Sequence, residues 1–305
     1  VLSGGFMCYF KLKDVSYKYP LEDREILKNI NLDIKKGEFW AVIGKNGSGK
    51  TTLCNVLRRF VPDFYKGELK GKITLESKEL KDYSAKEIVQ KVGFVFQNPF
   101  TQISGVKETV FEEIAFGLEN LALDAEYIRK RVEETLKLLR IEELRDKNPY
   151  ELSGGQGQKV ALASIIAMDP EIMVIDEPTS QLDPKGTEEI FEIIDILKKE
   201  GKTIILVEHK LELIAEYAEK VMVLDEGEMI LSGNTEDVLK NKILLEKEIG
   251  IPQYTALAYR LMDEGKVQFE EIPITKEKAV EVFAHKNFLA EDSKIEENTC
   301  QEEEK

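Results

Sequence analysis

Glycine, lysine and threonine are concentrated in "GKNGSGKT" (44–51), between an apolar run and a segment of helical character. The stretch fits the phosphate-binding pattern G-x-x-x-x-G-K-[ST], in which glycines let successive backbone N–H groups turn inward toward an anion. The lysine adds positive charge, and the hydroxyl of Thr51 is suited to ligate Mg²⁺. The sequence therefore predicts a site for a nucleotide's phosphate chain, made of Gly44, Lys45, Asn46, Gly47, Ser48, Gly49, Lys50, Thr51 and Thr52.

Two adjacent carboxylates follow the apolar run in "IMVIDE" (172–177). A buried strand here would end at Asp176, which could then hold Mg²⁺ through water. Glu177 would be positioned to accept a proton from an attacking water, a role in which a base contributes about 10²–10⁴ in rate. An Asp–Glu pair after a strand is often only the polar start of a surface loop. Its combination with the phosphate motif favours a catalytic role for the pair.

The elements that must position these residues are short apolar runs that alternate with helical patterns. Runs bounded by Gly, Asp or Pro predict buried strands at 39–44, 92–97, 172–176, 203–209 and 221–227. A helix is predicted over 184–200, with Asp183 as its N-cap and Pro184 in its first turn. Such alternation predicts an α/β fold with a mainly parallel sheet covered on both faces.

Three segments depart from this alternation. The stretch from about 99 to 155 predicts a helical insertion, because it carries a helical stripe of Ile128, Val132, Leu136 and Leu139. Residues 8–34 and 67–80 predict an antiparallel β subdomain. After about residue 240 the sequence becomes helix-prone and charged. We therefore predict a main domain over 1–240 and a small C-terminal extension over 241–305, whose acidic end at 290–305 is expected to be disordered.

Composition narrows the class of protein. With 42% hydrophobic and 33% charged residues, the 305-residue chain is typical of a globular protein. Its net charge of −15 argues against a nucleic-acid partner, which would require clustered Lys and Arg. The apolar runs are shorter than the roughly 20 residues of a membrane span, and no signal segment is recognised. Cys8, Cys54 and Cys300 are too widely spaced for a zinc site or a disulfide framework, and we expect Cys54 to be a core residue.

A second cluster of motifs resembles the ATP-binding cassette (ABC) ATPases. "LSGGQ" (152–156) is followed in order by "IMVIDE" and "PTSQLD", at the spacing of that family. Together with the phosphate motif, the resemblance covers residues from about 10 to 235 and implies a P-loop NTPase core of the RecA-like type. It implies ATP and Mg²⁺ as ligands, and catalysis by Glu177. It also implies a head-to-tail dimer, in which the signature residues contact ATP held by the partner cassette: Ser153, Gly154, Gly155 and Gln156.

Other family positions carry over individually. The resemblance implies that Tyr19 stacks on adenine, with Tyr17 as a weaker candidate. It implies that Gln97 contacts the Mg²⁺ and the attacking-water region, and that His209 is the switch histidine that touches the γ-phosphate. Asp183 matches the D-loop aspartate.

Two residues differ from the common pattern. Gln181 stands where Ala or Gly is usual in the D-loop, and Lys159 replaces a frequent Arg after the signature. The first bears on communication between the two sites. Neither removes a catalytic group.

Residues 94–123 resemble a narrower class, the ATPase subunits of energy-coupling factor (ECF) transporters, which import vitamins and transition-metal ions such as cobalt and nickel. The match reads "FQNPFTQ", then "TVFEEIAFGLEN", with Phe100 in place of Asp and Glu113-Ile114 in place of Asp-Val. Residues 250–265 resemble the extension through which such ATPases make additional contacts with each other, so the C-terminal extension is expected to serve dimerisation.

This narrower resemblance implies a location and partners. The chain would lie at the cytoplasmic face of the cell membrane, with a second ATPase subunit, a transmembrane scaffold subunit and a substrate-binding membrane subunit. The ATPase of a conventional ABC importer or exporter remains the alternative. The sequence names neither the transported substrate nor whether the second ATPase is identical or related.

Overall fold

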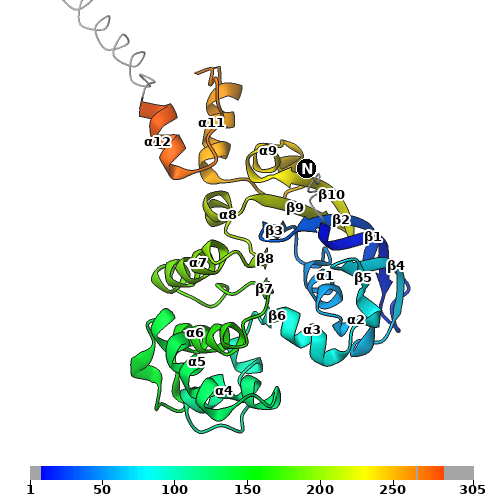
Figure 1. Ribbon diagram of the computed structural model, residues 1–305. Helices are drawn as coiled ribbons and strands as arrows, with labels where there is room; N and C mark the ends of the chain where they lie inside the picture. The colour runs from blue at the N-terminus through cyan, green and yellow to red at the C-terminus, as the bar shows by residue number, and fades with distance from the viewer. Residues whose placement is uncertain (1–7, 266, 285–305) are drawn as a thin grey trace, which may run out of the picture.

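The computed structural model describes residues 8–265 and 267–284. The predicted acidic tail, Cys300 and His285 lie outside these residues. No helix in this described part is both long and apolar enough to span a bilayer. Its elements form a central sheet, a smaller antiparallel sheet, a lobe of helices and a helical C-terminal segment (Figure 1).

The central sheet contains the five predicted apolar strands. Its order is β10-β9-β3-β8-β7-β6, in which all neighbours are parallel except the hairpin of β9 and β10. The parallel strands lie where the sequence predicts them, whereas β10 was not predicted. The bounds are β3 Phe39–Ile43, β6 Val92–Val95, β7 Ile172–Asp176, β8 Thr203–Val207, β9 Lys220–Asp225 and β10 Glu228–Asn234.

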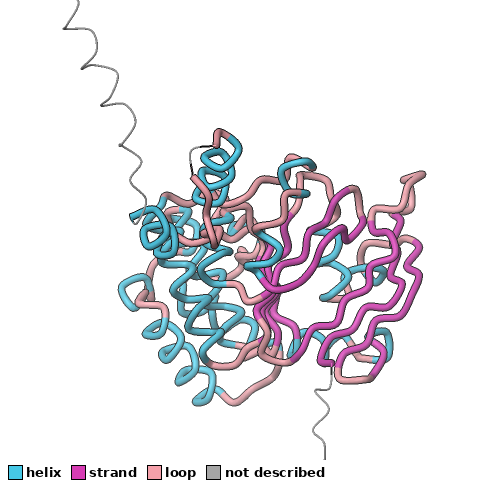
Figure 2. The backbone as a smooth tube through the Cα atoms, turned by 90° about the horizontal axis from the view of Figure 1, so that it is seen from above, coloured by secondary structure: helices cyan, strands magenta, loops and turns pink. Residues whose placement is uncertain are grey.

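Alternation along the central strands separates two cores. In β3, Phe39, Ala41 and Ile43 face one cluster, whereas Trp40 and Val42 face the other. Because successive side chains of a strand point to opposite faces, a fully apolar strand must be covered on both. Figure 2 shows most helices on one side of the core strands and the antiparallel strands on the other.

The first core lies under long helices and the helical lobe. The predicted stripe of Ile128, Val132, Leu136 and Leu139 is buried there. Asp183 caps α7 as expected, because its carboxylate accepts a hydrogen bond from Gly186 N at 2.7 Å. The lobe is helical as predicted. The helices on this side are α4 Val110–Asn120, α5 Ala125–Leu138, α6 Gly154–Ala167, α7 Pro184–Lys199 and α8 Leu211–Tyr217.

The second core lies under the antiparallel sheet, of order β2-β1-β4-β5. Cys54 of α1 is fully buried in this core, as expected. The elements on this side are β1 Cys8–Lys18, β2 Leu27–Lys35, β4 Glu68–Leu75, β5 Lys78–Glu79, α1 Lys50–Leu57, α2 Phe60–Asp63 and α3 Ala85–Lys91.

The C-terminal segment continues from the edge of the central sheet. Its helices are α9 Thr235–Leu239, α10 Ile243–Glu246, α11 Gln253–Asp263 and α12 Lys276–Ala284. Leu244 and Ile251 are buried against the first core, so this segment is packed onto the body rather than tethered to it. The boundary at 240 stays a prediction.

Glu171, immediately before β7, joins three segments. Its carboxylate accepts a hydrogen bond from Tyr9 Oη at 2.8 Å and is paired with Lys36 and Lys91. The hydrogen bond from Lys36, assisted by that from Tyr9, lowers the pKa of Glu171 from 4.5 to about 2. Glu171 thus links β1, the turn after β2 and α3 to the start of β7.

We expect Glu171→Gln to lower the Tm at pH 7 by about 1–3 °C, a modest effect because the pair is partly exposed to solvent. Since the pKa is lower in the folded state, this stabilisation is present above about pH 4.5 and is lost as the pH falls toward 2. Thermal unfolding from pH 7 to 3 should show the difference shrinking. Glu188→Gln, at an exposed position on α7, is the control, and a pH-independent difference for Glu171→Gln would contradict the assignment.

Candidate active site

The phosphate loop connects β3 to α1. Gly44 has a φ of +150°, and a side chain there would collide with the carbonyl oxygen of Leu224. Gly49 is the residue before α1 and has a φ of +104°, in the region that favours glycine. The backbone thus turns sharply at both ends, so that the N-terminus of α1 faces the loop, an arrangement that favours anions.

Lys50 lies beneath this loop and is 5% exposed. Its ammonium group donates hydrogen bonds to Gly44 O at 2.9 Å and Lys45 O at 3.0 Å. Burial lowers the pKa of Lys50, and the carboxylates of Glu177 and Asp176 oppose that change. The cation is therefore held in place by the loop's own carbonyl groups, close to where a phosphate would lie.

Three side chains from three strand ends meet at Glu177. Gln97 Nε2 donates a hydrogen bond to one carboxylate oxygen at 2.7 Å, and His209 Nε2 lies 2.9 Å from the other. Gln97 follows β6, Glu177 follows β7 and His209 follows β8. The structure therefore brings together all three residues that the sequence predicted to be catalytic.

The backbone at Glu177 is unusual. Its φ is +45°, in the left-handed region that non-glycine residues rarely adopt. Its N–H group donates to Val207 O at 2.9 Å, which ties the residue to the end of β8.

Asp176 is the last residue of β7 and is 5% exposed. Burial raises its pKa, while a hydrogen bond with the Thr51 side chain opposes the rise. One carboxylate oxygen, Oδ1, has no hydrogen-bond partner among the described residues. An unpartnered buried oxygen beside a hydroxyl fits a Mg²⁺ ion, which prefers oxygen ligands and keeps several waters.

A cavity of about 510 Å³ opens over these groups. It is lined by Arg24, Ile26, Asn46, Gly47, Gly49, Lys50, Thr51, Thr52, Gln97 and Glu177. Ser48 belongs to the same loop, and its buried Oγ has no hydrogen-bond partner in the described part of the chain. The loop, its threonine hydroxyls, Gln97 and Glu177 thus share one cavity, whereas His209 is not among its lining residues and is connected to it through Glu177.

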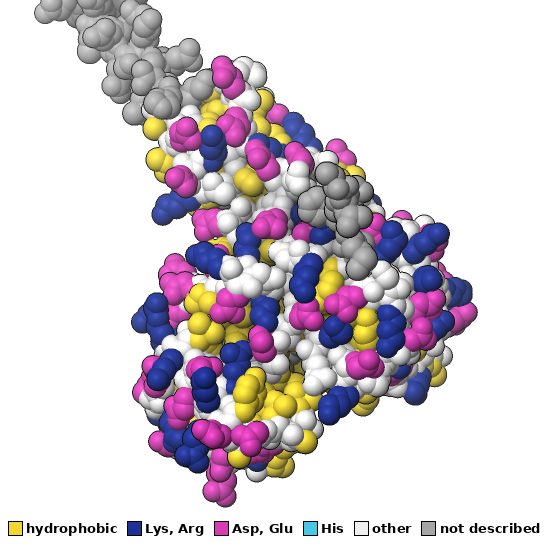
Figure 3. Space-filling model, in the orientation of Figure 1, with side chains coloured by type: hydrophobic (Ala, Val, Ile, Leu, Met, Phe, Trp, Pro, Cys, Tyr) yellow, Lys and Arg dark blue, Asp and Glu magenta, His cyan; other side chains and the backbone are white. Residues whose placement is uncertain are grey.

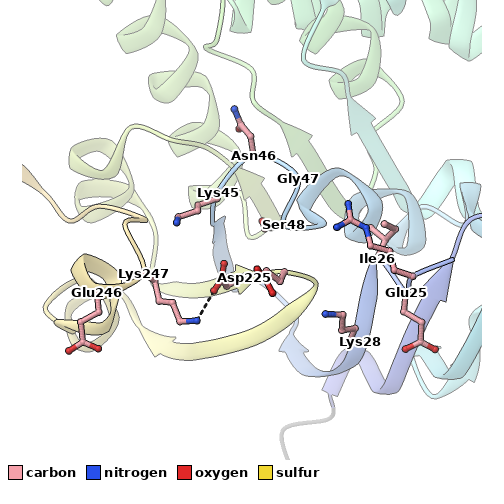
Figure 4. A pocket seen from close by; sticks show the side chains of 12 residues that line it. Glu25, Ile26, Lys28, Lys45, Asn46, Gly47, Ser48, Asp225, Glu246 and Lys247 are labelled. Atoms are coloured by element: carbon pink, nitrogen blue, oxygen red, sulfur yellow. Dashed lines mark ion pairs between the residues drawn. The ribbon is translucent and has the colours of Figure 1, made fainter. Parts of the chain in front are cut away.

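An adjoining cavity of about 540 Å³ shares Arg24, Ile26, Asn46 and Gly47 with the first (Figure 4). Its cations are largely paired. Lys247 lies 3.0 Å from Asp225, as the dashed line marks, and Lys45 lies 3.1 Å from Glu248. The smaller cavity, which holds Lys50 and Thr51, is therefore the better phosphate site.

Of the two tyrosines expected to be candidates for adenine contact, Tyr19 is the one that reaches the phosphate loop. Tyr17 is fully buried and donates its hydroxyl to the carbonyl groups of Tyr65 and Lys66. Tyr19 is half-buried, and its hydroxyl lies 3.3 Å from Thr52 Oγ1 in the phosphate loop. A base next to Thr52 could therefore reach the Tyr19 ring.

The signature residues lie away from this cavity, as the resemblance implies for one chain. Ser153 caps α6 by accepting a hydrogen bond from Gln156 N, and the Gln156 side chain accepts one from Ser153 N. The nearest contacts for a side chain at Gly154 or Gly155 would be Gln181 and Leu182 of the D-loop. Neither the signature nor the D-loop contributes to the described lining of the phosphate cavity.

The three residues that differ from the family pattern, Phe100, Lys159 and Gln181, each contact a neighbouring residue. The Phe100 ring lies against Gly157, next to the signature. Lys159 forms an ion pair with Glu189 at 2.8 Å, linking α6 to α7. Gln181 is exposed and offers its carbonyl group toward Gly154.

Several residues of the site were not predicted from the sequence. Arg24 and Ile26 line both cavities, and Glu248 reaches the phosphate loop from the C-terminal segment. These residues belong to no motif, and their distance along the chain hides their proximity.

A phosphate loop at the carboxyl edge of a parallel sheet, with a strand-end Asp and Glu beside it, defines a P-loop nucleotide-binding ATPase. The family described as ABC transporter matches residues 27–180. The chain belongs to this family: it is an ABC-type ATPase that binds and hydrolyses ATP.

Curated relatives match along almost the whole chain. A putative ABC transporter ATP-binding protein of Pyrococcus horikoshii is 41% identical, covering 91% of this chain and 97% of the relative. An energy-coupling factor transporter ATP-binding protein of Streptococcus thermophilus is 42% identical, covering 90% and 98%. Relatives thus carry both the general and the narrower name.

Solved structures agree on the fold. CbiO1 of Clostridium perfringens, described as part of the ABC transporter complex CbiONQ, is 34% identical with a TM-score of 0.69, covering 85% of this chain and 99% of that one. A cassette solved as a dimer in a post-hydrolysis state with ADP and Pi is 32% identical with a TM-score of 0.64, covering 74% and 98%.

We expect Lys50→Ala to weaken ATP binding roughly 10- to 100-fold, because a charge-assisted hydrogen bond contributes about 1.5–3 kcal/mol. Titration with a fluorescent ATP analogue would measure the affinity. Lys66→Ala, at an exposed lysine bonded to Asp63 O, is the control. Unchanged affinity in Lys50→Ala would contradict the phosphate cradle.

Proposed function

We propose that this chain is the ATPase subunit of an ECF-type importer, which uses ATP hydrolysis to drive uptake of a vitamin or a transition-metal ion such as cobalt or nickel. The main observation in support of ATP hydrolysis at this site is that Gln97 and His209 both contact the Glu177 carboxylate beside the phosphate loop. The ECF part is supported by the Streptococcus thermophilus relative and by CbiO1.

In the proposed reaction, the phosphate loop and Lys50 bind the phosphate chain, and Tyr19 stacks on the base. Glu177 accepts a proton from the attacking water, since its carboxylate lies at the strand edge that faces the cavity. Gln97 and His209 hold that carboxylate through its two oxygens, which fixes its orientation. His209 can also donate a hydrogen bond to the terminal phosphate, where charge develops.

Thr51 and Asp176 are the residues that would hold Mg²⁺, with Gln97 near it. When bound, Mg²⁺ neutralises phosphate charge and helps to orient the transferred group. The unpartnered Asp176 Oδ1 supports this assignment. Within the described residues no three His, Cys, Asp or Glu side chains form a metal cluster.

A second cassette would complete each site. Ser153, Gly154, Gly155 and Gln156 stand at the N-terminus of the 14-residue helix α6, where N–H groups and the helix dipole favour a negative charge. They lie apart from their own phosphate loop, which supports contact with ATP on the partner. Asp183 and Gln181, adjacent to the signature, would contribute to the same interface, and the C-terminal extension would add to it.

Glu177→Gln should retain ATP binding, lower kcat about 10²–10⁴-fold and favour a closed dimer, because the amide cannot accept the proton. Phosphate release, nucleotide titration and size-exclusion chromatography with ATP would measure the three effects. Glu188→Gln on α7 serves as the control. Normal hydrolysis by Glu177→Gln would overturn the general-base assignment.

A hydrophobic groove supports a membrane partner. It has a volume of about 170 Å³ and lies between α3, β6 and the end of α6, with Val89, Phe94, Phe96, Ile165 and Met168 among its lining residues. Figure 3 shows hydrophobic side chains gathered between the lobe of helices and the body of the molecule. Because Phe96 precedes Gln97, a scaffold helix in this groove would sense the state of the nucleotide site. The chain would then lie at the cytoplasmic face of the membrane.

Co-expression with the products of neighbouring genes, followed by purification, should recover a helical scaffold protein and a substrate-binding membrane protein with this chain. Val89→Asp should reduce that recovery at least tenfold, since it places a charge in an apolar contact, while basal ATP hydrolysis persists. Tyr127→Asp, at an exposed position on α5, is the control. Recovery of a conventional permease pair would instead favour the alternative ABC class.

A further inference from the structure

Glu208, the residue before His209, is a buried carboxylate that the proposed reaction does not use. It is 3% exposed. Its Oε2 accepts a hydrogen bond from Thr179 Oγ1 at 2.7 Å. Its Oε1 accepts hydrogen bonds from His209 N at 2.9 Å and Lys210 N at 3.3 Å. A buried charge is tolerated when such donors surround it.

Lys210, on the other side of His209, contacts the same neighbouring segment. Its ammonium group donates to Thr187 Oγ1 at 2.6 Å and to Thr179 O at 3.3 Å. Thr179 is 1% exposed and lies two residues after Glu177. The turn at 208–210 is therefore fastened on both sides of His209 to the segment that follows Glu177.

We infer that Glu208 and Thr179 are positioning residues, which hold His209 at its distance from Glu177. The inference rests on the proposed roles of Glu177 and His209. The His209 side chain is not fixed by deep packing, since it is 44% exposed, whereas that of Glu177 is 17% exposed. The buried Thr179–Glu208 hydrogen bond supplies a second, rigid connection between the ends of β7 and β8.

The hydrogen bonds of Glu208 connect the backbone of His209 to the segment that follows Glu177. The Glu208 carboxylate accepts the N–H group of His209 itself, so it fixes the backbone from which the imidazole projects. The Thr179 hydroxyl fixes that carboxylate from the Glu177 side. Because small misplacements of catalytic groups are costly in rate, loss of either partner should affect turnover more than nucleotide binding.

The test measures kcat and KM for ATP in variants of the full chain. Glu208→Leu and Thr179→Val remove the two partners and should each lower kcat about 10- to 100-fold with KM for ATP within about twofold. Glu208→Gln and Thr179→Ser keep an acceptor and a hydroxyl, and should retain kcat within about threefold. Combining Glu208→Leu with Thr179→Val should lower kcat little further, because both act on one contact.

Glu113→Leu is the matched control. Glu113 is also a buried carboxylate, 4% exposed, whose oxygens accept hydrogen bonds from Ser104 N at 2.8 Å and Ser104 Oγ at 2.7 Å, within the helical lobe. It should lower the Tm without the selective loss of kcat. If Glu208→Leu fails to fold, Thr179→Val alone decides the question.

The inference would be overturned by a normal kcat in Thr179→Val. It would also be overturned if kcat of the double variant fell by the product of the two single-variant losses. Glu177→Gln and His209→Ala measured in parallel separate two kinds of failure. If these two lose hydrolysis while Thr179→Val does not, only the positioning role is wrong. If His209→Ala hydrolyses ATP normally, the proposed catalytic role of His209 is wrong.

Discussion

The register of the parallel strands is the constraint on which the site depends. Val42 pairs with Val207, Ile175 with Leu206, and Val95 with Ile175, so that β3, β8, β7 and β6 end at nearly the same level. The phosphate loop, Gln97, Glu177 and His209 follow these ends within two residues. A slip of one residue in any ladder would turn its side chains to the other face of the sheet. The apolar alternation that fills two separate cores prevents such a slip.

Buried charge is concentrated at this same edge. Lys50, Asp176 and Glu208 are each at most 5% exposed, and each is held by loop carbonyls, a hydroxyl or backbone N–H groups. Burial disfavours the charged forms of Lys50 and Asp176, and both groups would gain a charged ligand on binding of Mg-ATP. This edge of the sheet is thus suited to bind the ATP polyanion together with Mg²⁺. Burying these charged groups costs desolvation free energy, which the two large hydrophobic cores offset.

The helical lobe is connected to the site by a small number of polar contacts. The Gln102 side chain accepts a hydrogen bond from Phe96 N at 3.2 Å and donates one to Ala161 O of α6 at 2.7 Å. The segment that ends in Gln97 is therefore fastened to the helix that begins with the signature. Movement of the lobe and of Gln97 would be coupled through this amide, beside the hydrophobic groove. Such coupling is what the proposed role beside a membrane partner would require.

The sequence alone determined the features that depend on a continuous stretch of backbone. The phosphate loop, the Asp–Glu pair after β7, the Ser153 cap and the parallel strands follow from local conformation and periodicity, which act within a few residues. Only the tertiary structure decided which distant residues meet. Gln97 and Glu177 are 80 residues apart in the chain, and His209 and Glu177 are 32 apart. The contact between Glu208 and Thr179, and the approach of Arg24 and Glu248 to the phosphate loop, also depend on strand order and packing, because these set distances that no local pattern encodes.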